Sequence, residues 1–403
     1  MTTTNSDTDT QAGFAHYFCD VDPQRKRVSR NLKWRQYPAD VVPAWIAEHD
    51  FRPPDTVVNA LTATIKDYAY GYNDLENDAA SAFVGWVGER YGWDADPELT
   101  DTHVGALAAV TAVITALTEP GDGVIVTPPI YNMFLEICPT SHRCQLEWLM
   151  RYDTNNGWHL HPDDLETLLK NEPKARVLLW CNPHNPTGWV PDQEALVRIV
   201  ELAHTYDFYV VSDEIHSDII HPPASFTPML TIPGAAERVI TVTSPAKTFV
   251  LSGLCFAVTA YGDATLRERV QTAHPPLLLG NAPRTGLDAA IAAWHTGSDW
   301  VDALIAELTQ RRDQLQARLT AEAPEIRFHA PQSTFLAWLD MSSYQLGVTP
   351  GAHLLEHARV AVQEGTMFGT NGDNHVRLNF GTSQSILDEI IDRIVSCLNG
   401  GCA

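Results

Sequence analysis

Short apolar segments alternate with amphipathic helical patterns between residues 100 and 261, and this alternation constrains the fold more than any other feature of the chain. Strands that are joined through helices run parallel and are covered on both faces, so their sequences are almost continuously apolar. We therefore expect an α/β fold with a seven-stranded, mostly parallel sheet. The expected strands are 102–104, 123–127, 144–150, 176–181, 209–213, 239–243 and 256–261.

The pattern changes after about residue 288, where a long charged helix is expected at 300–322. Strands at 326–329, 334–341 and 376–380 and a helix near His353 complete an α+β pattern. A chain of 403 residues is long enough for two domains. We expect a large domain over residues 51–290 and a smaller domain over residues 291–403.

The charge of the chain excludes several classes of partner. Lys and Arg number 27 against 50 Asp and Glu, which gives a net charge of −23. Such a chain is repelled by nucleic acid phosphates and by anionic lipids, so we expect neither a nucleic acid nor a membrane partner. The longest apolar stretch, 105–117, is too short to span a bilayer and is expected to form a buried helix. Residues 1–10 lack the basic and apolar regions of a secretory signal and are expected to form a flexible tail.

Cysteine usage indicates a reducing compartment. The seven cysteines lie at positions 19, 138, 144, 181, 255, 397 and 402, without the paired spacing of a metal site. Their odd number argues against a complete disulfide framework. We expect no metal and a cytoplasmic location.

Three segments that follow expected strands carry side chains of complementary chemistry. Asn185 opens Asn-Pro-Thr-Gly, Asp213 ends an apolar run, and Lys247 lies in Ser-Pro-Ala-Lys-Thr-Phe. In parallel sheets, ligands bind beyond the carboxyl ends of the strands, where all three residues are expected. Taken singly, they would be a turn residue, a helix cap and a surface charge. In this order they describe a site for pyridoxal phosphate, in which Lys247 binds the aldehyde and moves a substrate proton while Asp213 keeps the pyridine nitrogen protonated.

The chain resembles the fold-type I aminotransferase superfamily, and within it the MalY/PatB-like cystathionine β-lyases, from about Trp34 to Val395. Generic aminotransferases usually have a tyrosine where this chain has His216, which favours the lyase branch. The most specific segments are Ser-Asp-Glu-Ile-His at 212–216 and Pro-Gln-Ser-Thr at 331–334. The other segments that carry the resemblance are 70–72, 118–122, 127–131, 181–188, 335–338 and 376–380.

The resemblance implies how the cofactor phosphate is held. The backbone amides of Gly105, Ala106 and Leu107, at the start of the expected buried helix, would surround the phosphate. Ser244 would add a hydroxyl, although it could also be a plain turn residue. Tyr72 of the partner subunit would reach the same phosphate, so the resemblance implies a homodimer. It also implies that residues 1–50 contribute to the small domain.

The remaining roles concern the cofactor ring and the substrate. Tyr131 would stack on the pyridine ring. Asn185 and His216 would hydrogen-bond the phenolic oxygen, although a histidine at a strand end is more often structural. Arg377, together with Asn185, would bind the α-carboxylate of an amino-acid substrate through paired hydrogen bonds. A structural ion pair is the alternative role for Arg377.

The resemblance implies a carbon–sulfur β-lyase that cleaves cystathionine or another cysteine S-conjugate to a thiol, pyruvate and ammonia. Transamination begins with the same proton removal, so an aminotransferase remains an alternative. A decarboxylating oxidative deaminase of specialised biosynthesis is a third possibility, because two segments depart from the family pattern. They are Ala-Glu-His-Asp at 47–50, where Ala-Asp-Met-Asp is usual, and 365–369. The presence of Lys247, Asp213 and Arg377 argues against a regulator that acts only through a protein partner.

Overall fold

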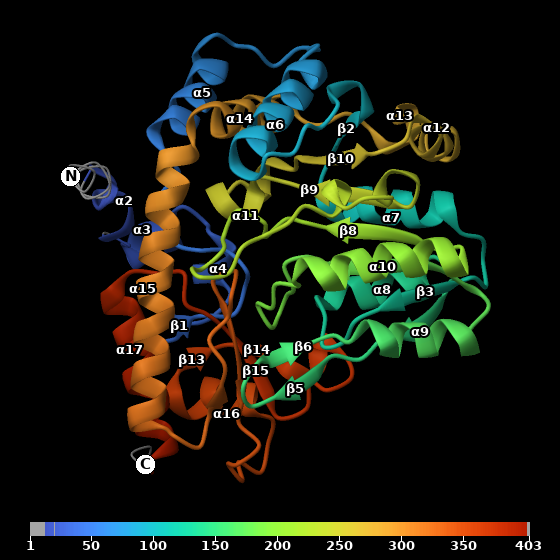
Figure 1. The fold of residues 1–403 in the computed structure, drawn as a ribbon. Coiled ribbons are helices and arrows are strands. Elements are labelled where there is room, and N and C mark those ends of the chain that lie inside the picture. The colour runs from blue at the N-terminus through green and yellow to red at the C-terminus, as the bar shows by residue number, and fades with distance from the viewer. Residues whose placement is uncertain (1–12, 20, 401–403) are drawn as a thin grey trace, which may run out of the picture.

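The computed structural model describes residues 13–19 and 21–400, so the predicted flexible tail lies outside the described residues. Its centre is a seven-stranded sheet in the order β2-β10-β9-β8-β7-β3-β4 (Figure 1). Only the pairs made by β10 are antiparallel. The predicted fold class is therefore confirmed, and all seven expected strands are present. They are β2 (Thr100–His103), β3 (Gly123–Val126), β4 (Cys144–Glu147), β7 (Ala175–Cys181), β8 (Tyr209–Asp213), β9 (Val239–Thr243) and β10 (Ala257–Tyr261).

Helices cover both faces of this sheet, as the apolar strands require. Along β7, Val177 and Leu179 join the core on the side of α7, whereas Leu178 and Trp180 join the core on the side of α10. The predicted buried helix is α7, and none of the helices in the described ranges combines the length and apolarity of a bilayer crossing. The covering helices are α7 (Ala106–Leu117), α8 (Asn132–Thr140), α9 (Pro162–Asn171), α10 (Gln193–Tyr206) and α12 (Ala264–Ala273).

Further helices pack at the β2–β10 end of the sheet and around the carboxyl ends of its strands (Figure 1). The long helix α14 contacts both α5 and α6. A one-turn helix, α11, follows β9, and a short hairpin joins β4 to α9. These elements are α5 (Asp55–Lys66), α6 (Glu76–Tyr91), α11 (Ala246–Phe249), α13 (Pro276–Leu279), α14 (Arg284–Thr296), β5 (Arg151–Asp153) and β6 (Gly157–His159).

A second, four-stranded antiparallel sheet, in the order β11-β12-β15-β14, is built from the C-terminal part of the chain. The N-terminal segment packs beside it. Strand β1 (Val42–Pro43) pairs in parallel with β13 (Val360–Ala361) in a separate two-stranded sheet, and Asn379 N on β15 donates to Ala44 O at 2.8 Å. The N-terminal helices lie beside α15 in Figure 1. The remaining elements are α2 (His16–Cys19), α3 (Pro23–Val28), α4 (Leu32–Arg35), α15 (Ser298–Glu322), β11 (Arg327–Phe328), β12 (Leu336–Asp340), α16 (Pro350–His353), β14 (Gln363–Glu364), β15 (His375–Asn379) and α17 (Gln384–Leu398).

The segment 331–334 connects two loops that leave the carboxyl ends of the large sheet. Gln332 N donates to Gly188 O at 3.0 Å, which fixes the end of the Asn-Pro-Thr-Gly loop. Thr334 N donates to Ile219 O at 2.9 Å, in the loop that follows Asp213. The motif at 331–334 is therefore packed against the loop that follows the motif at 212–216.

Gly188 permits this contact, and its replacement tests the packing. Its φ is +70°, and a Cβ atom there would lie 2.3 Å from Pro331 Cβ. We expect Gly188→Ala to lower the free energy of unfolding by about 1–3 kcal/mol, measured by urea denaturation. Gly85→Ala is the control, because Gly85 lies in α6 with nothing within 4 Å of the added atom. That change should stabilise the protein by about 0.5–1 kcal/mol. Equal effects at both positions would contradict the close packing.

Candidate active site

Lys247 lies on the one-turn helix α11 just beyond β9, and its side chain points into the protein. Its Nζ donates to the carbonyl oxygen of Ala47 at 2.8 Å. Burial lowers the pKa of Lys247 to about 8, and the nearby charge of Arg377 acts in the same direction. A lysine that loses its proton near neutral pH can act both as a nucleophile and as a general base.

Asp213 ends the central strand β8, opposite Cys181 on β7. Its carboxylate is 6% exposed and accepts a hydrogen bond from Ile215 N at 3.2 Å. Burial raises the pKa of Asp213 to about 7, and the charge of Lys247 opposes this shift only in part. A buried carboxylate whose negative charge is so weakly stabilised by its surroundings is poised to bind a cationic group.

Arg377 lies on β15, and its side chain reaches Asn185. The residue is 2% exposed. Nη1 donates to Asn185 Oδ1 at 2.9 Å, and Nη2 donates to Trp45 O at 3.2 Å and to Gln363 Oε1. The guanidinium lies 4.9 Å from the centre of the Phe368 ring. None of the described Asp and Glu residues forms a salt bridge with it, so the alternative role as a structural ion pair is not realised within the described ranges. A buried guanidinium without a carboxylate is a strong candidate for binding one from a substrate.

His216 and Tyr131 lie in the same region. His216 is 2% exposed, burial lowers its pKa to about 3, and its Nδ1 has no partner among the described residues. It is therefore neutral, and its buried Nδ1 is available to a ligand. Tyr131 immediately precedes α8, and burial raises the pKa of its phenol. Its electrostatic contacts with Arg377, Asp213 and Cys181 place it within the cluster.

The start of α7 provides unpaired backbone donors. The first hydrogen bond there runs from Ala109 N to Gly105 O at 3.1 Å, so the amides of Ala106 and Leu107 precede the intrahelical pattern. Gly105 has φ +148° and ψ 157°, a conformation that suits only glycine. Residues 104–108 line an open cavity of about 670 Å³. These donors are arranged to bind an anion.

Ser244 and Tyr72 are less directly placed. The hydroxyl of Ser244 donates to Phe256 O at 2.6 Å and accepts from Ala246 N at 3.1 Å, so in this structure it stabilises its own turn. Tyr72 is fully exposed and takes part in none of the contacts that join the other predicted residues. The hydrogen bonds and electrostatic interactions among the described residues of the single chain therefore link Tyr131, Asn185, Asp213, His216, Lys247 and Arg377, but they do not link Tyr72, Ser244 or the start of α7 to this cluster.

Sequence reasoning missed several groups that hold this cluster. The carbonyl oxygens of Trp45 and Ala47 accept from Arg377 and Lys247, and a backbone acceptor has no sequence signature. Asn379 Nδ2 donates to the carbonyl oxygens of Ile46 and Glu48, both at 2.7 Å. The only available signal for Asn379 was its place two residues after Arg377, on the same side of β15.

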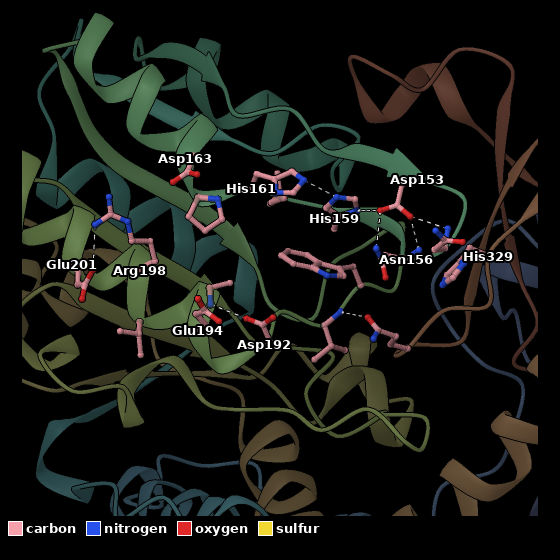
Figure 2. A pocket seen from close by; sticks show the side chains of 18 residues that line it. Asp153, Asn156, His159, His161, Asp163, Asp192, Glu194, Arg198, Glu201 and His329 are labelled. Atoms are coloured by element: carbon pink, nitrogen blue, oxygen red, sulfur yellow. Dashed lines mark hydrogen bonds and ion pairs between the residues drawn. The ribbon is translucent and has the colours of Figure 1, made fainter.

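A larger cavity, of about 1060 Å³, lies elsewhere, between the β5–β6 hairpin, α9, α10 and residues 329–332 (Figure 2). None of the predicted site residues lines it. His159 Nε2 and His161 Nε2 are 2.8 Å apart on one side, and Arg198 pairs with Glu201 on the other. Within the described ranges, no three His, Cys, Asp or Glu side chains are grouped so as to hold a metal ion. The cavity therefore has polar walls but, among the described residues, no group arranged to bind a metal ion.

The cluster around Lys247, Asp213 and Arg377, together with the start of α7, matches the chemical groups of pyridoxal phosphate. Lys247 offers an amine for the aldehyde, Asp213 an uncompensated carboxylate for the pyridine nitrogen, and the start of α7 a set of amides for the phosphate. The free Nδ1 of His216 and the unpartnered Nε of Arg377 are orphaned polar atoms that a bound ligand could satisfy. The residues present fit this cofactor.

Comparisons with known proteins agree with the geometry. The aminotransferase class I and II family matches residues 31–394. Cystathionine β-lyase PatB of Bacillus subtilis is 31% identical over 388 residues, which are 94% of this chain and 100% of PatB. Cystathionine β-lyase of Corynebacterium glutamicum is 29% identical over 92% of this chain and 97% of its own. A crystal structure from Corynebacterium diphtheriae, assigned as a PLP-dependent β-cystathionase, has a TM-score of 0.89 at 29% identity and covers 95% of this chain and 99% of its own.

The raised pKa of Asp213 predicts how the cofactor-free protein responds to pH. Burial keeps more protons on Asp213 in the folded than in the unfolded chain between its usual pKa of 3.8 and about 7. Its contribution to the free energy of unfolding therefore falls as pH rises through this range. Asp213→Asn removes the ionisation, so the variant should gain stability relative to wild type between pH 4 and pH 7.5, measured by urea denaturation. Glu214, whose pKa burial raises to about 8, is present in both proteins, and loss of the neighbouring Asp213 charge lowers the pKa of Glu214, which acts in the same direction. A stability difference that does not change with pH would show that Asp213 is not desolvated.

Proposed function

The chain belongs to the aminotransferase class I and II family, and from this membership and the site we propose that it is a pyridoxal-phosphate-dependent carbon–sulfur β-lyase. Its substrate is cystathionine or another cysteine S-conjugate, and its products are a thiol, pyruvate and ammonia. The observation that carries the proposal is the burial of Arg377, without an acidic partner in the described part of the chain, beside Lys247 and Asp213. The names of PatB and of the Corynebacterium glutamicum relative support the choice of reaction.

We assign the cofactor contacts to residues of the large sheet. Lys247 binds the aldehyde, and Asp213 pairs with the pyridine nitrogen. Tyr131 lies against the ring, and the amides at the start of α7 bind the phosphate. His216 is neutral, so its free Nδ1 hydrogen-bonds the ring oxygen without adding charge to the site.

The substrate is oriented by its carboxylate. Arg377 binds the two carboxylate oxygens, and Asn185, which already accepts from Nη1, sets the plane of the guanidinium. This hold keeps the carboxylate away from the reacting position and presents the Cα–H bond to Lys247. Pyridoxal phosphate, when bound, withdraws electrons from the substrate Cα.

The amino group of the substrate would displace Lys247 from the aldehyde, and the freed lysine amine then removes the Cα proton, for which its lowered pKa suits it. The electron pair left at Cα forms a double bond to Cβ, and the Cβ–S bond breaks with its electrons going to sulfur. The sulfur leaves as a thiolate and takes up a proton. Water hydrolyses the remaining three-carbon unit to pyruvate and ammonia, so the atoms balance without an external oxidant.

The products of the cofactor-loaded enzyme test the reaction. With L-cystathionine we expect homocysteine, pyruvate and ammonia in equal amounts, measured by mass spectrometry. Lys247→Ala removes the base and should lower turnover by about 10³-fold or more, whereas Lys170→Ala, at an exposed position of α9, should not. An intact thioether bearing a keto acid would instead establish transamination. A thioether shortened by carbon dioxide would establish decarboxylative deamination.

We also propose that the protein is a homodimer. Ile65, Tyr68, Tyr70 and Tyr72 are 59%, 81%, 63% and 107% exposed, and such a group of apolar side chains is typical of a contact surface. A second copy that covers this surface would bring Tyr72 to the phosphate site of its partner.

Mixed dimers test this arrangement. Light scattering should give twice the 44.6 kDa of one chain. Coexpression of Lys247→Ala with Tyr72→Ala gives mixed dimers. If Tyr72 acts in the active site of the partner subunit, one site of each mixed dimer lacks both side chains and the other site has both. Activity should then exceed that of either variant alone. No gain in the mixed dimers would mean that Tyr72 does not act across the interface.

A further inference from the structure

Lys247 lies on a helix that is too short to be stable without contacts from other parts of the chain. Helix α11 has one turn, Ala246–Phe249, and the last carbonyl groups of a helix lack intrahelical donors. Thr248, next to the lysine, is held from two sides. Its hydroxyl donates to Asp218 Oδ2 at 2.8 Å, and its carbonyl oxygen lies 2.9 Å from His49 Nε2. An external donor therefore satisfies a carbonyl at the end of the turn that positions the base.

His49 can serve only as a donor in this contact. It is fully buried, and burial lowers its pKa to about 3, so the ring is neutral. A carbonyl oxygen only accepts, which places the ring proton on Nε2. The Nδ1 atom is then an acceptor with no partner among the described residues, at a cost of about 1–3 kcal/mol. The rings of Phe51, Trp300 and Phe335 surround it, so an apolar side chain would avoid that cost.

The same short segment also contacts the proposed carboxylate-binding arginine. Trp45 O accepts from Arg377 Nη2 at 3.2 Å, and Ala47 O accepts from Lys247 Nζ at 2.8 Å. Asn379 fixes the segment from β15 through its two bonds to the intervening carbonyl oxygens. Residue 45 thus contacts Arg377, residue 47 contacts Lys247, and residue 49 contacts the helix that carries Lys247.

We propose that His49 is a positioning residue for proton transfer. By donating from Nε2 to Thr248 O, it locks the one-turn helix of Lys247 to the segment that also holds Arg377, so that the base and the carboxylate site keep a fixed separation. The proposal rests on the proposed roles of Lys247 and Arg377. It predicts that loss of the donor misplaces the amine while leaving substrate binding nearly intact.

The experiment uses His49→Met, which fills the site without a donor, and His49→Gln, whose carboxamide can still donate. The first readout is exchange of the Cα hydrogen of L-alanine for deuterium in D₂O, followed by NMR on the cofactor-loaded protein. The second is the fraction of Lys247 that carries covalently attached cofactor after borohydride reduction, measured by mass spectrometry. For His49→Met we expect exchange to slow on the order of 10- to 100-fold, because a small misplacement of a catalytic group has effects of this size. The attached fraction should fall as well, whereas KM for L-cystathionine changes by less than about threefold.

His221→Met is the matched control. His221 is also fully buried, and its Nε2 lies 2.7 Å from a backbone carbonyl oxygen, that of Thr334. This variant loses that hydrogen bond and a second one, between His221 Nδ1 and Thr309 Oγ1 at 2.9 Å, and should still keep exchange and attachment within about threefold of wild type. His49→Gln should do the same. Should His49→Met fail to fold, His49→Asn, whose donor lies closer to the backbone, replaces it under the same criteria.

Two results would overturn the proposal. One is equal exchange rates in His49→Met and His221→Met, and the other is a His49→Gln variant as slow as the Met variant. Failure of the proposed roles of Lys247 and the cofactor gives a different result, because wild type would then not exchange the Cα hydrogen of L-alanine at all. Exchange also precedes any choice between elimination and transamination, so it tests His49 whichever products form.

Discussion

The guanidinium of Arg377 is buried among neutral acceptors, and the electrostatic state of the whole site depends on it. Asn185, Gln363 and the carbonyl oxygen of Trp45 bind it without neutralising its charge, and burial lowers its pKa to about 10. Its positive charge also lowers the pKa of Lys247 and of His216. A cation retained in such surroundings is destabilising until an anion binds. The site is therefore arranged in advance for a carboxylate, and burial together with the same charge lowers the pKa of Lys247 to about 8.

This arrangement depends on contacts between the two sheets. Arg377 and Asn379 leave β15 on one side, where they meet the Asn185 loop and residues 45–48. The segment 331–334 makes a second connection, because it binds both Gly188 and the loop after Asp213. Hydrogen bonds thus hold together groups from widely separated parts of the chain, and a displacement of about one ångström would slow the reaction.

The sequence was sufficient for the large sheet because its strands are buried on both faces and read as continuous apolar runs. The candidate residues that follow those strands, Asn185, Asp213 and Lys247, could be placed because ligands bind at the carboxyl ends of parallel strands. The support around them could not be predicted. His49 and Thr248 are 199 positions apart, and the acceptors at Trp45 and Ala47 are backbone atoms whose location depends on tertiary packing. Tyr72 is exposed in one chain, so its role cannot be derived from a single copy.

The pairing of β1 with β13 also sets the order in which the site can form during synthesis. Residues 42–50 leave the ribosome early, but their partners on β13 and β15 are made only after all strands of the large sheet. Until then, the large sheet can fold and present Lys247, Asp213 and the start of α7, while the supports of the lysine and the arginine itself are still missing. Translation therefore separates assembly of the cofactor-binding surface from assembly of the reactive geometry, because domains fold as units as the chain emerges. A truncated chain that ends before β15 would retain much of the former and lack the latter.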